Sequence, residues 1–392
     1  MGSRQIKLLQ IVNSLQPGGM ENIVVEVCNR LNPQQFAVTV CCLEKLGAFA
    51  ERLRPEVARM ELRKEPGFRW KDVTALRRLM VGGGFDVIHT HHLGGLIYAA
   101  LARGFSRTPR IVHSEHIILH DWELEPRRLW QRRLLYPLAA WCVFTVSARQ
   151  LAQLRELRLW QRRMFSLTNG VDVRRFGPAV EAQAALRRRL GLLADGVFLG
   201  KVARFATAKR HLALIEAFEK VAAEQPRLHL LLVGDGGIEK ERVLARIAAS
   251  PGRERIHLAG LQQEPAPWYQ VMDVLVSASE NEGLPNAVLE GMACGLPVLA
   301  NDACGVRELA HDGEHGWIGD FSTVERLAEG LRRAVTTPEA RRREMGLAAC
   351  AHVRRRFSIE AMLEKYERLY TAAARGESAI FDTPAGNMPA TG

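Results

Sequence analysis

The chain has 392 residues, 47% of them apolar, and its 54 basic and 43 acidic side chains give a formal net charge of +11. The length predicts two domains, and the composition excludes a disordered chain. The longest apolar run, residues 134–148, contains Pro137 and falls short of the roughly 20 residues that span a bilayer, which excludes a transmembrane helix. The basic charge predicts an anionic partner: nucleic acid, an anionic membrane surface or a phosphorylated ligand.

The amino terminus and the cysteines indicate the compartment. The start of the chain has no long apolar stretch followed by a small-residue cleavage site. The seven cysteines include no CxxC pair and no regular spacing, which indicates reduced thiols. We therefore expect a cytosolic protein.

Short apolar segments alternate with longer amphipathic ones, a rhythm that predicts βαβ units and parallel sheets. In the first half, the predicted strands are residues 6–12, 37–43, 85–91, 110–116 and 142–147. The rhythm restarts in the second half, with predicted strands at residues 197–205, 228–234, 255–260, 271–278 and 296–302. We predict an α/β protein with two Rossmann-like sheets in series.

A turn-rich segment separates the two halves and contains the turn signal Asn169-Gly170. We predict an amino-terminal domain over residues 1–177 and a carboxyl-terminal domain over residues 178–374. The second domain ends in helices with apolar residues at spacings of three and four, at residues 324–335, 339–357 and 358–374. The tail, residues 375–392, is predicted to be disordered because it is rich in Gly, Ser, Thr and Pro.

Two glutamates eight residues apart, Glu282 and Glu290, follow a predicted strand that ends near Ser277. Pro285 suits the first position of a helix, because it lacks an N–H group and its φ is fixed. Glu282 is therefore predicted in the strand-to-helix loop and Glu290 inside the helix. Both would border the crevice at the carboxyl end of the sheet.

The start of that helix indicates what the glutamates contact. The free N–H groups of residues 286–288 favour an anion such as phosphate. A carboxylate repels phosphate but accepts hydrogen bonds from hydroxyls. A nucleotide sugar offers both phosphates and hydroxyls. For the pair taken alone, a capping glutamate and a solvated one remain the simpler interpretation.

Two further loops of the second half point to the same ligand. Arg204 and Lys209 follow its first strand, where their charges can neutralise a diphosphate, although solvated surface residues are the alternative. Gly234 and Asp235 follow a buried strand, where the backbone can approach a nucleotide. Glu239 stands where the third glycine of a dinucleotide fingerprint would be, which disfavours an oxidoreductase.

Near the amino end, Gly18 and Gly19 lie between the first strand and the next helix, where a flexible loop can approach a phosphate. The segment lacks the GKS or GKT of a P-loop. Glycines in such a turn also occur for steric reasons alone.

Together these motifs resemble the retaining glycosyltransferases of family 4, which have the GT-B fold. The segment from Glu282 to Glu290 matches the family's glutamate pair with its seven intervening residues. Further matches follow in family order over about residues 7–370: PGGME, DVIHTHH, NGVDVRRF, VARFATAKRH, LLVGDGG, LAGLQQE and GVRELAHDGEHG. The resemblance implies two Rossmann-like domains that face each other across a cleft, with carboxyl-terminal helices.

Carried over residue by residue, the resemblance implies that Glu290 accepts the ribose hydroxyls and Glu282 those of the donor sugar. Arg204 and Lys209 would hold the diphosphate, and His116 resembles the family's active-site histidine. The implied catalytic residues are His116, Glu282, Arg204 and Lys209. The other implied donor contacts are Gly18, Gly19, Gly234, Asp235, Gly283, Leu284, Pro285 and Asn286.

The resemblance also implies the type of reaction. Configuration at the anomeric carbon would be retained by front-face attack, assisted by the leaving phosphate and without an enzyme nucleophile. No DxD triplet occurs in the sequence, which agrees with an enzyme that needs no metal and no other cofactor. The donor would be a nucleotide-diphosphate sugar; its sugar and base, the acceptor, the linkage and the oligomeric state stay open.

Two features depart from the family pattern. Cys304 and Gly305 stand where many relatives have paired glycines, which leaves the donor-sugar loop open. Half of the twelve histidines lie between residues 89 and 120, and their spacing allows a zinc site. We favour histidines that line the cleft or satisfy local hydrogen bonds, because acidic ligands are sparse. The six are His89, His91, His92, His113, His116 and His120.

The first half interleaves arginines with tryptophans at positions 122, 130, 141 and 160. Such segments can bind an anionic membrane, although ordinary amphipathic helices are the alternative. Because the family's amino-terminal domain handles the acceptor, we expect a lipid-linked or polysaccharide acceptor and a peripheral location on the inner face of a bacterial membrane. Nucleic acid is disfavoured, since no nucleic-acid module is recognisable. The alternative functions are a non-catalytic membrane-associated scaffold and a zinc-dependent hydrolase.

Overall fold

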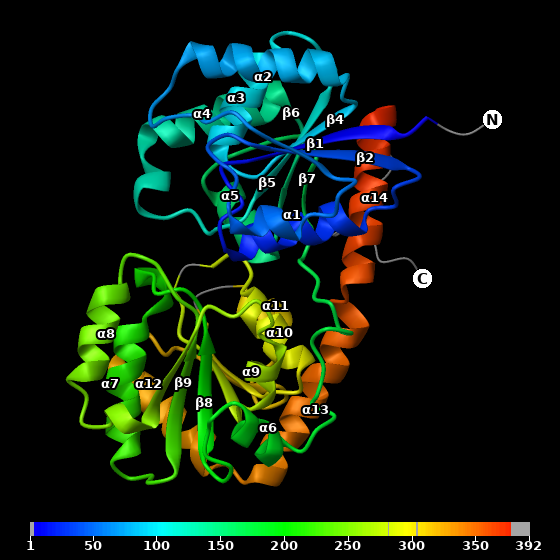
Figure 1. The fold of residues 1–392 in the computed structure, drawn as a ribbon. Helices are drawn as coiled ribbons and strands as arrows, with labels where there is room; N and C mark the ends of the chain where they lie inside the picture. The colour runs from blue at the N-terminus through cyan, green and yellow to red at the C-terminus, as the bar shows by residue number, and fades with distance from the viewer. Residues whose placement is uncertain (1–3, 281, 303–304, 378–392) are drawn as a thin grey trace. The chain divides into compact units, whose positions relative to one another are not determined.

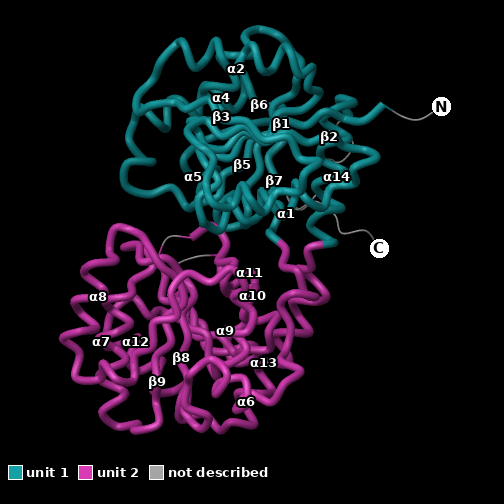
Figure 2. Tube along the Cα trace, in the orientation of Figure 1, with its two compact units in different colours: residues 1–169, 360–392 teal, residues 170–359 magenta. Residues whose placement is uncertain are grey.

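A computed structural model describes residues 4–280, 282–302 and 305–377. Figure 1 shows its helices and strands, and Figure 2 its division into two compact units. The first unit combines Met1–Asn169 with the carboxyl-terminal part of the chain from Glu360, and the second unit is Gly170–Ile359. Among the described residues, no helix has the length and apolar character needed to cross a bilayer.

The first unit is built on a seven-stranded parallel sheet in the order β3-β2-β1-β4-β5-β6-β7. The strand order reverses between β1 and β4, the kind of point at which open α/β sheets bind ligands. The strands are β1 Ile6–Val12, β2 Phe36–Cys42, β3 Ala58–Glu61, β4 Val87–Thr90, β5 Arg110–Glu115, β6 Ala140–Thr145 and β7 Met164–Ser166. The helices are α1 Gly19–Arg30, α2 Trp70–Gly83, α3 Leu93–Arg103, α4 Pro126–Ala139, α5 Ala148–Glu156 and α14 Ile359–Arg375.

The second unit has a six-stranded parallel sheet in the order β10-β9-β8-β11-β12-β13, which reverses between β8 and β11. The strands are β8 Val197–Val202, β9 Leu228–Val233, β10 Ile256–Gly260, β11 Val274–Ser277, β12 Val298–Asn301 and β13 Gly316–Gly319. The helices are α6 Gln183–Arg189, α7 His211–Ala222, α8 Lys240–Ala248, α9 Ala266–Gln270, α10 Asn286–Ala293, α11 Val306–Leu309, α12 Val324–Thr336 and α13 Glu339–Arg356.

The predicted strands and carboxyl-terminal helices are all present, with ends shifted by a few residues. Central strands such as β9, LHLLLV, are buried along their whole length, as expected when helices cover both faces of a parallel sheet. The sequence prediction missed β3, β7 and β13. The first is an edge strand with mostly exposed side chains, the second has three residues, and the third begins and ends with glycine. None of them carries the apolar run that marks a buried strand.

The division of the chain differs from the predicted boundary between residues 177 and 178. Val171 stays with the second unit because its N–H donates to the Phe357 carbonyl at 2.9 Å, and its own carbonyl accepts from Ile359 at 2.9 Å. The helix α14, predicted to belong to the second domain, packs on the first sheet instead. Its Tyr370 is buried and accepts a hydrogen bond from Gln10 Nε2 at 2.9 Å.

The predicted tail also begins later than expected, because Arg375 is the last residue of α14. Residues 378–392 lie outside the described part of the chain. A helical spacing of apolar residues predicts a helix but does not say which sheet the helix covers.

Candidate functional site

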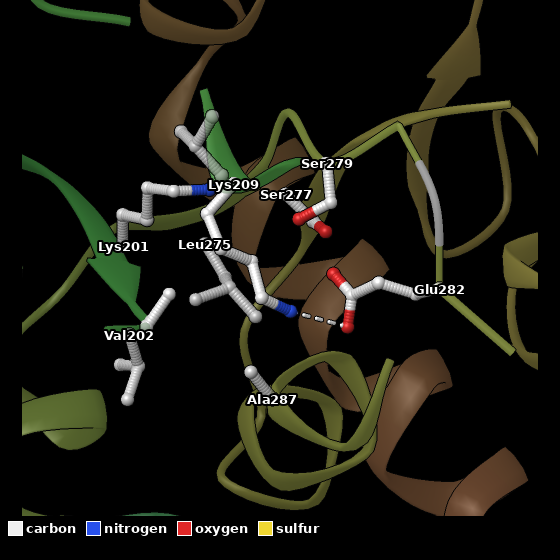
Figure 3. A pocket seen from close by; sticks show the side chains of 10 residues that line it. Lys201, Val202, Lys209, Leu275, Ser277, Ser279, Glu282 and Ala287 are labelled. Carbon is white, nitrogen blue, oxygen red and sulfur yellow. Dashed lines mark ion pairs between the residues drawn. The ribbon is translucent and has the colours of Figure 1, made fainter. Parts of the chain in front are cut away.

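The carboxyl edge of the second sheet holds a small pocket where the strand order reverses, between β8 and β11. The cavity measures about 20 Å³, which is room for about one water molecule. Figure 3 shows the side chains around it. They belong to Lys201, Val202, Ala203, Lys209, Leu275, Val276, Ser277, Ser279, Glu282 and Ala287.

An ion pair between Lys209 and Glu282 lies in this pocket (Figure 3), with Nζ 2.7 Å from Oε2. Lys209 ends a short 3-10 helix after β8, and Glu282 lies between β11 and α10, so adjacent strands bring the two together. Burial alone would raise the pKa of Glu282. The charge and hydrogen bond of Lys209, a hydrogen bond from Ser279 and the charge of Lys201 outweigh burial, so the pKa lies below its usual value. Glu282 is a carboxylate that stays ionised although it is largely enclosed.

A second ammonium group reaches the pocket from β8, and it was not predicted from the sequence. Lys201 is only 2% exposed, and Figure 3 shows its side chain extending into the pocket. The signal was a lysine inside the apolar strand VFLGKV, since a buried strand rarely holds a charge without an anion nearby. The described lining residues therefore carry two ammonium groups and one carboxylate.

Arg204 and Asp235 follow neighbouring strands at the same edge. The Arg204 side chain is exposed just beyond β8. Asp235, just beyond β9, pairs with Lys240 at 2.8 Å and accepts a hydrogen bond from the Gly236 N–H at 2.7 Å. The Asp235 carboxylate is therefore engaged by protein groups in this structure. Its predicted contact with a nucleotide-sugar donor stays a prediction.

Gly234 has a steric role in this edge. Its φ is +136°, and a Cβ atom there would lie 2.2 Å from the Ala203 carbonyl oxygen. The glycine therefore allows the loop after β9 to approach the loop after β8. A contact between Gly234 and a nucleotide stays a prediction.

Glu290 lies inside α10, more than one turn beyond Glu282, as predicted. Its Oε2 accepts a hydrogen bond from the buried Tyr269 hydroxyl at 2.7 Å. Burial and then the charge of Glu290 raise the pKa of Tyr269, so the tyrosine stays a hydrogen-bond donor. This partner was not predicted, because Tyr269 lies in α9, a five-residue helix without a sequence motif.

The segment before α10 brings the remaining predicted donor contacts to the carboxyl edge. Pro285 is the N-cap of α10 and Asn286 its first residue, one position later than predicted. Gly283 and Leu284 are buried. Cys304, at the departure from the family pattern, lies outside the described residues.

In the first unit, the predicted residues also lie at a carboxyl sheet edge. Gly18 is the N-cap of α1 and Gly19 its first residue, at the end of the loop that follows β1. His116 follows β5, and its Nε2 lies 2.8 Å from Ser114 Oγ and 3.1 Å from His91 Nδ1. Burial, assisted by the charge of His92, lowers the pKa of His116 to about 3. His116 is therefore a neutral imidazole at physiological pH.

The six crowded histidines do not form one cluster. His89, His91 and His116 share hydrogen bonds with Ser114. His113 belongs to a separate arrangement, with its Nδ1 2.8 Å from Thr90 Oγ1 and its Nε2 3.5 Å from Glu115 Oε1. Glu115 accepts a further hydrogen bond from the buried Arg132 at 2.8 Å.

Local hydrogen bonds thus reach ring nitrogens of His89, His91, His113 and His116, which is the arrangement that the favoured interpretation describes. In the described part of the chain, one group brings three ligand atoms close enough together for a metal ion: His311, Glu314 and His315. His315 Nδ1 accepts the His311 backbone N–H at 3.1 Å, so its Nε2 carries the hydrogen of the neutral ring and offers no lone pair to a metal.

Comparisons with known proteins agree with this geometry. Two family models match the chain: "Glycosyltransferase Family 4" over residues 17–175 and "Glycosyl transferases group 1" over residues 183–349. The D-inositol 3-phosphate glycosyltransferase of Thermobispora bispora is 30% identical over 313 residues, which cover 74% of this chain and 71% of that protein. The lipopolysaccharide core biosynthesis glycosyltransferase LpsE of Rhizobium meliloti is 30% identical over 213 residues, 54% of this chain and 58% of that protein.

A solved structure shows the same fold. Anabaena Alr3699/HepE, crystallised in complex with UDP and glucose, has a TM-score of 0.83 at 20% sequence identity, over 94% of this chain and 100% of that one. Two parallel α/β sheets in series and this likeness identify the GT-B fold. The sequence motifs, the two family models and the relative that shares 30% identity lead to one conclusion: the chain belongs to glycosyltransferase family 4.

Proposed function

We propose that the protein is a retaining glycosyltransferase that moves a sugar from a nucleotide-diphosphate sugar to a hydroxyl of a lipid-linked or polysaccharide acceptor, without a metal ion. One observation carries this proposal. At the switch point of the second sheet, two ammonium groups and one ionised carboxylate, Lys201, Lys209 and Glu282, share a single pocket.

The charges of this pocket suit a donor diphosphate. The described lining residues carry two ammonium groups and one carboxylate, so the pocket has a net positive charge. A diphosphate brings negative charge, and Arg204 adds a further exposed cation just beyond β8. We expect Lys209 to turn from Glu282 toward the phosphate when the donor binds. Glu282 would then accept hydrogen bonds from the sugar hydroxyls while Lys201 keeps it ionised.

Glu290 serves the other end of the donor in this proposal. The Tyr269 hydroxyl holds one carboxylate oxygen at 2.7 Å and so fixes the orientation of the group. A carboxylate held in this way accepts hydrogen bonds from the two ribose hydroxyls. The spacing of Glu282 and Glu290, with seven residues between them, corresponds to the distance between the sugar and the ribose.

The same cations would assist departure of the diphosphate. As the bond between the anomeric carbon and the phosphate oxygen breaks, negative charge develops on the phosphate, and Lys201, Lys209 and Arg204 stabilise it. The acceptor hydroxyl attacks on the face that the phosphate leaves, and its proton passes to a phosphate oxygen. Configuration is retained, and the three cations take the place that a divalent metal holds in other transferases.

The α4 helix supports peripheral attachment to an anionic membrane. Trp130, Leu134 and Leu138 follow one another at intervals of four residues on its surface, with exposed fractions of 61%, 41% and 72%. Arg127 and Arg133 are exposed on the same helix. Apolar side chains enter the interface of a bilayer, while arginines bind lipid phosphates. Such a surface suits an acceptor with a lipid anchor on the inner leaflet.

The donor proposal is tested by thermal unfolding with UDP-, GDP- and ADP-sugars in the presence of EDTA, followed by NMR of the product formed from the best binder. We expect stabilisation by one donor class and a product with the anomeric configuration of the donor. A protein that no nucleotide stabilises would overturn the donor site. Binding without transfer or slow donor hydrolysis would favour the scaffold alternative, and a strict need for a divalent ion would remove metal independence.

The membrane proposal is tested by co-sedimentation with vesicles of phosphatidylglycerol and phosphatidylcholine. The double variant Trp130→Ser with Leu138→Ser should lose most binding to the anionic vesicles. The control is Leu347→Ser, because Leu347 is 57% exposed but lies on α13 in the second unit. Equal binding of both variants would remove α4 from the membrane surface.

A further inference from the structure

A closed ring of hydrogen bonds lies next to His116 in the first unit. It joins β1, β4, β5 and α14, and its members are at most 3% exposed. The members are Gln10, His89, His91, Ser114 and Tyr370.

Gln10 determines which nitrogen of His91 carries the hydrogen. Its Nε2 donates to the Tyr370 hydroxyl at 2.9 Å, and its Oε1 lies 2.7 Å from His91 Nε2. An amide oxygen only accepts hydrogen bonds, so His91 Nε2 must be the donor. Burial, assisted by the neighbouring His89, lowers the pKa of His91 well below its usual value, so the ring is neutral. The Nδ1 of His91 is therefore left with a lone pair.

The rest of the ring follows from Tyr370. Because its oxygen accepts from Gln10, its hydrogen goes to His89 Nδ1, 2.8 Å away. His89 then carries its own hydrogen on Nε2 and donates it to Ser114 Oγ at 3.0 Å. Every donor between Gln10 and Ser114 is thereby assigned.

A triangle of polar atoms remains at the end of this chain: Ser114 Oγ, His91 Nδ1 and His116 Nε2. Its sides measure 3.2 Å, 3.1 Å and 2.8 Å. If His116 Nε2 carried no hydrogen, two lone pairs would face each other across the 3.1 Å side, and the single Ser114 hydrogen could satisfy only one of them. A hydrogen on His116 Nε2 removes this conflict. His116 then donates to Ser114 Oγ at 2.8 Å, and Ser114 donates its own hydrogen to His91 Nδ1, which closes the ring.

We propose that Gln10 and His91 are positioning residues that hold His116 as the Nε2–H tautomer, so that His116 offers the lone pair of its Nδ1 to a sugar hydroxyl. A ring that ran in the opposite direction would require the Gln10 amide to be reversed. His91 would then donate from Nδ1, and His116 would present an N–H group in place of a lone pair. The direction of the ring therefore decides whether His116 accepts or donates a hydrogen bond.

The proposal rests on the proposed function where it assigns a sugar hydroxyl to His116, but its tautomer can be measured without turnover. Two-dimensional ¹⁵N–¹H NMR of the full chain labelled at histidine distinguishes ring nitrogens with and without hydrogen. We expect His116 and His91 both to carry hydrogen on Nε2 and a lone pair on Nδ1. A wild-type His116 with its hydrogen on Nδ1 would overturn the proposal.

Variants connect the tautomer to turnover. Gln10→Met removes both amide hydrogen bonds at similar size, and Tyr370→Phe breaks the ring at its other side. We expect each to mix the His116 tautomers and to lower kcat by about 10- to 100-fold, less than the roughly 10²- to 10⁴-fold that a catalytic acid or base itself contributes, because only its positioning is lost. The KM for the donor and the thermal shift with nucleoside diphosphate should stay close to wild type.

Thr90→Val is the matched control. It deletes a buried hydrogen bond of 2.8 Å to His113 from the same sheet edge, but its side chain is outside the ring. We expect an unchanged His116 tautomer and kcat. If Gln10→Met and Thr90→Val changed the His116 tautomer and kcat equally, the role of the ring would be structural only. If the wild type transferred no sugar, the proposed function would fail while the NMR assignment would still test the ring.

Discussion

Each of the two units has a polar site at the carboxyl edge of its parallel sheet. One site consists of charged groups, and the other consists of neutral groups that share hydrogen bonds. In the second unit, the site consists of full charges, with Lys209 paired to Glu282 at 2.7 Å and Lys201 beside them. In the first unit, it consists of neutral groups whose hydrogen bonds run in one direction around His91 and Ser114. Buried charges suit a charged ligand, whereas the neutral ring determines which nitrogen of each histidine carries a hydrogen.

Lys209→Met gives the strongest test of the charged site. It removes the main partner of Glu282 and one of the cations that we propose to stabilise the leaving diphosphate. We expect loss of the thermal shift with nucleoside diphosphate and a fall in kcat of about 10³-fold, as for loss of a group that stabilises transition-state charge. Lys220→Met is the control, because Lys220 is exposed and lies outside the pocket. Its Nζ is 3.9 Å from Glu325 Oε1. Retention of nucleotide binding in Lys209→Met would contradict the assignment.

Lys201→Met tests nucleotide affinity and the free energy of unfolding separately at the same site. We expect the affinity for nucleoside diphosphate to fall by about 10- to 100-fold, the value of one charge-assisted hydrogen bond. The free energy of unfolding of the unliganded protein should fall as well, because the substitution removes one of the charges that keep the enclosed Glu282 ionised. Isothermal titration and denaturant unfolding measure the two effects. An unchanged affinity would make Lys201 a partner of Glu282 only.

The pH dependence of stability tests the neutral site. Burial lowers the pKa of His89 well below its usual value of 6.5. A group whose pKa is lower in the folded state binds more protons when unfolded, so its contribution is complete above pH 6.5 and is lost as the pH falls. Between about pH 6 and pH 5, we expect the wild type to lose up to about 1.4 kcal/mol per pH unit more than His89→Gln.

Denaturant unfolding at several pH values measures this difference. His120→Gln is the control, because His120 lies outside the ring and contacts the exposed Asp121. The change in slope that His89→Gln causes should exceed the change that His120→Gln causes. Equal slopes for the wild type and His89→Gln would show that His89 is not held neutral by the fold.

Tyr269→Phe should have the smallest effect and sharpens the role of Glu290. The loss of one neutral donor to the carboxylate costs about 1 kcal/mol, so we expect about 5-fold weaker binding of nucleoside diphosphate. The affinity for inorganic diphosphate should not change, because Glu290 is assigned to the ribose. Tyr366→Phe is the control, since the Tyr366 hydroxyl is buried without a hydrogen-bond partner among the described residues.

Sequence motifs predicted the charged site better than the neutral one. The motifs around Lys209 and Glu282 sit on loops beyond strands, and parallel strands bring such loops to one edge whatever the details of packing. Lys201 was missed because a single lysine in an apolar strand has no spacing to interpret. Tyr269 was missed for the same reason, since it reaches Glu290 from a separate short helix.

The ring around His91 was less predictable because it depends on tertiary structure. The histidines were noted as a crowd, but their division between two arrangements follows from which face of β4 and β5 each side chain occupies. Gln10 and Tyr370 are 360 residues apart in the chain. Their contact forms only when α14 packs on the first sheet, and no local sequence pattern predicts that packing.

The position of α14 has a consequence for biosynthesis. The first unit is assembled from two separate segments of the chain, and the second unit is inserted between them. During translation, the strands of the first sheet leave the ribosome before the second unit, whereas Tyr370 emerges only after it. The second unit can complete its core before the first one can, although it is synthesised later. Chains that stop before α14 would therefore expose the polar ring that the last helix covers.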